Sequence, residues 1–169
     1  MKNNSEFTQL LDKISDFKKK YYKNLLLKGI LIGLGLVLAS YLIINFLEYF
    51  GRFGSTFRAV LLISFILVAG YTLFFFILKP LFYLFKINEP LSDTDAAQQI
   101  GKFFPNIKDK LLNTQQLAKG LTDSDSALLE ASINQKTKEL KFVKFADAIN
   151  FQENKKYLKY ALPPLLAII

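Results

Sequence analysis

The chain has 169 residues, no cysteine, no histidine and a formal net charge of +8. It can therefore form no disulfide, no thiolate or imidazole metal site and no Ser-His-Asp or Cys-His triad. The positive charge is compatible with nucleic-acid binding, but its carriers are nearly all lysines, which typically flank membrane spans beside anionic headgroups. Most aromatic residues fall in apolar runs instead of a polar groove, so we do not expect a nucleic-acid partner.

Residues 1–24 predict an amphipathic cytoplasmic helix. Its apolar positions recur every three or four residues, at Phe7, Leu10, Leu11, Ile14, Phe17 and Tyr21. Two interpretations stay open: the stripe lies on the anionic inner leaflet, or it packs against the rest of the cytoplasmic part. The lysines toward the membrane end are candidates for contact with the membrane surface: Lys18, Lys19, Lys20, Lys23 and Lys28.

Residues 25–85 contain two apolar runs, 29–47 and 59–78, that carry no formal charge. About twenty helical residues, rising about 1.5 Å each, cover the roughly 30 Å hydrocarbon core of a bilayer. The short turn between the runs makes the two helices antiparallel neighbours. The first run is too long, and begins too late, for the apolar region of a cleaved signal peptide. The region therefore predicts a transmembrane helical hairpin.

Small residues along the first span predict close helix–helix packing. Gly29 and Gly33 form a G-x-x-x-G motif, and Gly35 and Ala39 repeat its spacing. Ordinary glycine enrichment of membrane spans gives the same pattern, and the partner would be either the second span or another subunit. Polar residues that could line a transport pathway are few: Ser40, Asn45, Ser64 and Thr72.

Orientation follows from the lysines, which outnumber the two turn arginines on both outer flanks of the hairpin. Both ends of the hairpin are therefore expected in the cytoplasm. In the turn, Gly51 and Gly54 are expected to relieve the backbone. Pro80 is expected to kink or restart the helix at the inner interface. The aromatic residues around it are typical of an interfacial belt, or of a groove for a lipid or a partner helix.

Residues 86–160 predict a small cytoplasmic helical segment. One helix should start within 92–95 and stop at Pro105, a second should be capped by Asn106 and end at Gly120, and a third should be capped within 123–125. Residues 142–145 alternate and suit a short extended piece, and 151–160 is again helical. Two aspartate pairs, 93/95 and 123/125, lack the further oxygen ligands of a calcium loop and are interpreted as helix caps.

Residues 161–169 form an apolar run of about 14 Å as a helix, too short to cross a bilayer. Pro163 and Pro164 suit the first turn of a helix. We expect this run to be the truncated start of a third transmembrane helix in a longer protein.

Three stretches, DTDAAQQIG at 93–101, FPNIKDKLLN at 104–113 and LLEASI at 128–133, resemble a pattern in large bacterial inner-membrane proteins. These proteins are grouped as domain-of-unknown-function family four-one-seven-five. The resemblance implies a two-span hairpin, a small cytoplasmic helical segment, a third span and a long extracytoplasmic region. It carries no activity over to any residue.

The expected protein is all-α, with a two-span transmembrane helical hairpin, a cytoplasmic helical segment and the start of a third span. We expect a non-catalytic subunit of a bacterial envelope complex, such as one for protein export or secretion, in the inner membrane with its N-terminus cytoplasmic. Its expected partners are the bilayer and other membrane proteins, with no cofactor, metal or small-molecule substrate. The alternatives are a transporter or channel component, or the membrane anchor of an enzyme whose active part lies outside this chain.

Overall fold

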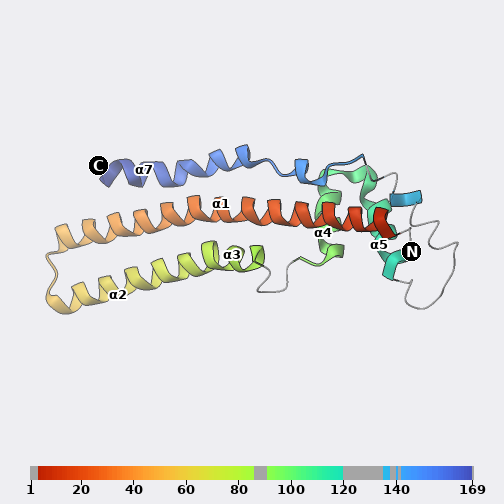
Figure 1. Ribbon diagram of the computed structural model, residues 1–169. Helices are drawn as coiled ribbons and strands as arrows, with labels where there is room; N and C mark the ends of the chain where they lie inside the picture. Colours follow the sequence, from red (N-terminus) through yellow and green to blue (C-terminus); the bar gives the residue numbers. More distant parts are fainter. Residues whose placement is uncertain (1–3, 86–90, 120–134, 138–139, 141, 169) are drawn as a thin grey trace. The chain divides into compact units, whose positions relative to one another are not determined.

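The computed structural model describes residues 4–85, 91–119, 135–137, 140 and 142–168 (Figure 1). The regular elements in this described part are all helices, which confirms the all-α prediction. The chain divides into two compact units. Unit 1 comprises Met1–Tyr21 and Glu89–Asn150, and unit 2 comprises Tyr22–Asn88 and Phe151–Ile169. Helix α1 (Asn4–Gly51) is unbroken and contributes residues to both units.

Unit 1 has a small hydrophobic core between the first turns of α1, helices α4 (Asp93–Phe103) and α5 (Pro105–Lys119), and the 3₁₀ turn η3 (Phe145–Ala148). Its buried members are Leu10, Ile14, Phe17, Ala96, Ala97, Ile100, Leu111, Leu140, Phe145 and Ile149. Leu10, Ile14 and Phe17 of the N-terminal stripe are therefore core residues, which confirms the packed interpretation for these side chains. The inner-leaflet interpretation is wrong for these side chains, because apolar groups sealed in a protein core cannot also enter lipid.

The start of α4 follows the sequence prediction closely. The Ser92 hydroxyl accepts a hydrogen bond from the Asp95 backbone N–H (3.1 Å) and lies 2.6 Å from the Asp95 carboxylate. Asp93 and Asp95 occupy the first turn, where negative charge complements the helix dipole. The helix ends at Phe103, just before Pro105, as expected.

Helix α5 begins at Pro105, so the prediction that Asn106 caps it is wrong. Proline suits the first helical position because its ring fixes φ and its missing N–H needs no partner there. The Phe104 carbonyl accepts from the Ile107 N–H at 3.2 Å, which closes the first turn. The predicted end at Gly120 and the third helix capped within 123–125 lie outside the described residues.

Unit 2 contains the rest of α1, helix α2 (Ser55–Thr72), the π-helical segment η1 (Leu73–Leu78), helix α3 (Lys79–Leu84), the 3₁₀ helix η4 (Phe151–Tyr157) and helix α7 (Leu158–Ile168). In Figure 1, α2 and α7 run along different sides of α1. Two helical stretches, Thr8–Gly51 and Ser55–Leu84, are long and apolar enough to cross a membrane.

The turn between the two long helices does not use its glycines as predicted. Among the described residues, the left-handed backbone position belongs to Arg52, with φ at 42°, and no glycine has a positive φ. Gly54 instead precedes α2 in an extended conformation. The Arg58 guanidinium lies 3.1 Å from the Glu48 carboxylate, so an ion pair joins the two sides of the turn.

Two prolines disturb the helices of unit 2 in different ways. Before Pro80 the helix widens into η1, where the Lys79 N–H bonds to the Phe74 carbonyl, five residues back. Widening relieves the clash between the proline ring and the preceding turn. Pro163 and Pro164 lie inside α7, which begins at Leu158, so their predicted place in a first turn is wrong. The 3₁₀ helix η4 runs directly into α7, and helical geometry is already established when the prolines are reached.

Candidate functional site

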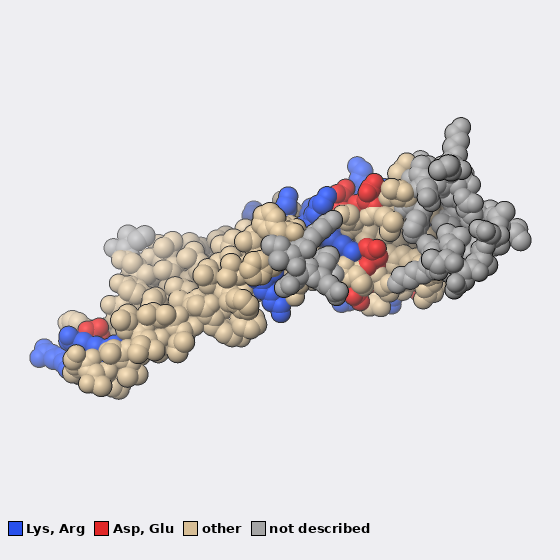
Figure 2. Space-filling model, turned by 60° about the horizontal axis from the view of Figure 1, so that its bottom comes forward, with Lys and Arg blue, Asp and Glu red and all other residues tan. Residues whose placement is uncertain are grey.

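The surface of the long helices in unit 2 is predominantly apolar and uncovered. Large side chains such as Ile43, Phe46, Leu62 and Leu67 are 60, 64, 59 and 67% exposed. Only 11 and 6% of the most apolar windows of the two candidate spans are buried. Figure 2 shows the same feature on one face, where uncharged residues cover the helices of unit 2 and charged residues gather toward its ends. So large an apolar surface needs lipid or protein to cover it.

Two of the four predicted packing residues face the second long helix. A β carbon on Gly29 would collide with the backbone carbonyl oxygen of Phe76. A β carbon on Gly33 would stand 3.1 Å from the Thr72 methyl carbon Cγ2. Thr72 is 2% exposed, and its hydroxyl has no hydrogen-bond partner among the described residues. The glycines therefore bring the backbones of α1 and η1 close together.

Gly35 faces a different neighbour, helix α7. A β carbon there would stand 2.5 Å from the Tyr160 carbonyl oxygen. Ala39, the fourth predicted packing residue, is half-buried. The predicted small-residue set is thus divided between two neighbouring helices and does not form one stripe.

The two backbone oxygens at these contacts share a feature that was not predicted from the sequence. Each belongs to the residue four places before a proline: Phe76 before Pro80, and Tyr160 before Pro164. Proline has no N–H, so neither carbonyl has its normal α-helical donor. In both places a glycine Cα–H of α1 points toward the oxygen, as in the weak Cα–H···O contacts of helix interfaces. The sequence signal for these contacts was the small-residue motif of the first span together with a proline in each of the later apolar segments.

The predicted membrane-surface lysines have different environments. In unit 1, the Lys18 ammonium lies 2.7 Å from the Asp93 carboxylate, and its side chain is only 16% exposed. In unit 2, the Lys28 ammonium lies 4.9 Å from the centre of the Tyr157 ring. Its hydrogen bond to the hydroxyl lowers the pKa of Tyr157, because a nearby cation favours the phenolate. Contact with a membrane surface stays a prediction for Lys18, Lys19, Lys20, Lys23 and Lys28.

Three of the four polar residues predicted as candidates for a transport pathway are bonded within their own helix. The side chains of Ser40, Asn45 and Ser64 each donate to a carbonyl of their own helix, at 2.8, 2.8 and 2.7 Å. Such bonds satisfy the polar group within its own helix. The described residues also contain no cluster of three or more acidic side chains that could hold a metal ion.

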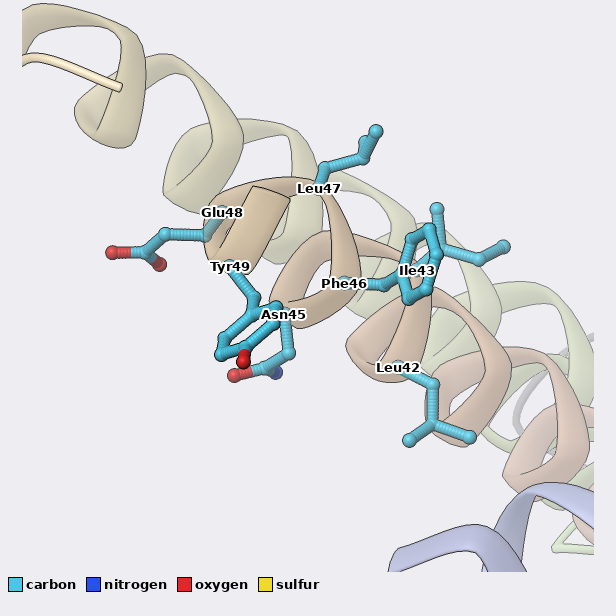
Figure 3. Close-up of a pocket in the computed structure, with 7 residues that line it drawn as sticks. All are labelled: Leu42, Ile43, Asn45, Phe46, Leu47, Glu48 and Tyr49. Atoms are coloured by element: carbon cyan, nitrogen blue, oxygen red, sulfur yellow. The ribbon is translucent and has the colours of Figure 1, made fainter. Parts of the chain in front are cut away.

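Two of the hollows on the described part of unit 2 differ in character. The larger, about 870 Å³, is bordered by seven residues of α1 between Leu42 and Tyr49. Figure 3 shows that these side chains come from one helix and point to several sides of it, so they do not enclose a ligand. The smaller, about 320 Å³, lies between α1 and the η1–α3 segment, and its lining includes Lys28 and Lys79.

Comparisons with protein-family models, with curated proteins and with solved structures find no match to this chain.

Proposed function

We propose that this chain is an integral membrane protein whose two long helices form a two-span hairpin, and that it serves as a non-catalytic subunit of a membrane complex. The observation that carries the membrane assignment is the uncovered apolar surface of both helices. A helix of equal hydropathy in the core of a water-soluble protein would be mostly buried, whereas the candidate spans are 11 and 6% buried in their most apolar windows. In water that surface would aggregate, and in a bilayer it meets acyl chains.

The N-terminal position of α1 raises the alternative of a cleaved signal sequence. Against this, Leu10, Ile14 and Phe17, from the same unbroken helix, belong to the core of unit 1. Removing the start of α1 would take three buried side chains out of that core. A retained span is therefore the better interpretation.

The subunit role is supported by the side-chain chemistry of the described residues. They offer no metal-binding cluster, and the side chains of Ser40, Asn45 and Ser64 bond to carbonyls of their own helices. The surfaces that remain are apolar helix faces in unit 2, which other membrane proteins could cover. The proposed setting is the bacterial inner membrane, with the N-terminus cytoplasmic; lysine placement and the resemblance to family four-one-seven-five support it.

Cysteine labelling tests the membrane assignment and the topology, because the natural chain has no cysteine to replace. Ser55 is exposed at the turn, and Asn113 is exposed on α5. In intact cells a membrane-impermeant maleimide should label Ser55→Cys and leave Asn113→Cys unlabelled until lysis. The unsubstituted chain is the blank. Labelling of Asn113→Cys in intact cells would refute the orientation, and release of the protein by alkaline carbonate would refute the membrane assignment.

Purification in mild detergent tests the subunit role. Defined partner proteins in stoichiometric amounts are the expected result. A single monodisperse species containing only this chain would contradict it.

A further inference from the structure

The smaller hollow of unit 2 has the composition of a site for a charged amphiphile. Its lining combines two lysines with apolar and aromatic side chains from α1, η1 and α3: Leu25, Lys28, Gly29, Ile32, Phe75, Phe76, Lys79, Pro80 and Tyr83. Its volume of about 320 Å³ is at the small end of the range for ligand pockets. The groove lies beside the close backbone contact between Gly29 and Phe76, which both border it.

The two lysines bring positive charge to the groove, and neither forms an ion pair with a described carboxylate. Lys28 lies 4.9 Å from the Tyr157 ring centre, and Lys79 lies 5.8 Å from that of Phe75. No carboxylate of the described residues lies within 4.0 Å of either ammonium. Lys28 also donates a hydrogen bond to the Tyr157 hydroxyl, which uses one of its three N–H groups and leaves the other two available to an anion. The groove therefore offers two ammonium groups to one ligand.

The lysines also stand at the ends of the uncharged runs. Lys28 directly precedes the run 29–47, and Lys79 directly follows the run 59–78. In an antiparallel hairpin these two positions fall at the same membrane boundary, where phospholipid headgroups lie. Three residues that border the groove belong to the uncharged runs themselves: Ile32, Phe75 and Phe76. Their apolar side chains are suited to contact with hydrocarbon.

We propose that this groove binds an anionic phospholipid, with its phosphate between Lys28 and Lys79 and part of an acyl chain against the apolar lining. The inference depends on the membrane location proposed above. Inorganic phosphate would use only the lysines and leave the apolar lining exposed to water. The combination of two cations and an apolar groove therefore favours a lipid over a free anion.

The test measures binding of phosphatidylglycerol, phosphatidylcholine, glycerol phosphate and inorganic phosphate to the purified full chain in uncharged detergent. Phosphatidylglycerol should bind most tightly, and neither water-soluble anion should displace it at equal concentration. The double variant Lys28→Gln/Lys79→Gln should weaken its binding by about 30-fold, since each lysine at an anionic headgroup is worth roughly fivefold. Each single variant should lose about fivefold.

The matched control is Lys155→Gln/Lys159→Gln, which removes the same charge from two exposed lysines of unit 2 outside the groove. It should leave phosphatidylglycerol binding unchanged, and circular dichroism should show all variants equally helical. Equal binding of both lipids, an equal loss in the control, or displacement by glycerol phosphate or inorganic phosphate would overturn the lipid site. Those results leave the membrane assignment standing, which carbonate extraction tests separately.

Discussion

Replacing Gly29 with alanine should push α1 and η1 apart. The new β carbon would collide with the Phe76 carbonyl oxygen, which is backbone and cannot rotate away as a side chain could. Overpacking of this kind typically costs about 1–3 kcal/mol. Alanine also gains up to about 1 kcal/mol in helix propensity over glycine, which partly hides the cost. A second glycine is therefore needed as a reference.

Gly70 is that reference, because a β carbon there has no atom within 4 Å. Gly70→Ala gains the same propensity without the collision. The difference in unfolding free energy between Gly29→Ala and Gly70→Ala therefore isolates the packing cost, about 1–3 kcal/mol.

The assay uses a cysteine at Thr72, which is 2% exposed in a chain that has no other cysteine. In the Thr72→Cys background, a thiol reagent reacts only when the helices separate. The Gly29→Ala variant should react about 5- to 150-fold faster than Gly70→Ala, which is the same range of free energy expressed as a rate ratio. Equal reaction rates for the two variants would refute the proposed close contact between Gly29 and Phe76.

Three further predictions concern other parts of the chain. Phe17→Ala should destabilise unit 1 by about 3–5 kcal/mol, because the ring is fully buried. Hydrogen exchange of the α4 amides in the full chain measures this loss, and unchanged protection would contradict the core assignment. Ser92→Ala should cost about 1 kcal/mol through loss of the cap to Asp95, measured in the same way, with Ser92→Asp expected to restore it. Lys28→Gln should raise the pKa of Tyr157 toward 10.0, because the hydrogen-bonding cation that favours the phenolate is removed. Ultraviolet titration measures this pKa, with Tyr157→Phe identifying the signal of Tyr157. An unchanged titration would exclude the contact between Lys28 and Tyr157.

The features that the sequence predicted correctly are those with a local cause. The cap at Ser92 and the stop before Pro105 depend on residues a few positions apart, and the structure has both. The two apolar runs likewise needed only length and composition.

Other features depended on neighbours that the sequence does not identify. The N-terminal stripe suited both a lipid surface and a protein core, and what decides between them is that Phe17 shares a buried core with residues of α4 and α5. The G-x-x-x-G spacing indicated close packing, but not that Gly35 would meet α7 while Gly29 meets η1. Arg52 takes the left-handed position although Gly51 and Gly54 lie nearby, and no local pattern in the sequence indicates this.

The carbonyls that face Gly29 and Gly35 have a consequence for how the neighbouring helices are aligned along α1. A backbone oxygen that loses its α-helical donor is more costly in hydrocarbon than in water, and here a glycine of α1 lies against it. Sliding η1 by one helical turn toward the start of α1 would bring the Phe76 oxygen toward Leu25 or Leu26, which share the face of Gly29 and carry β carbons. The proline–glycine pairs therefore restrict the axial register of the neighbouring helices against α1, a specificity that apolar side chains in lipid cannot supply by themselves.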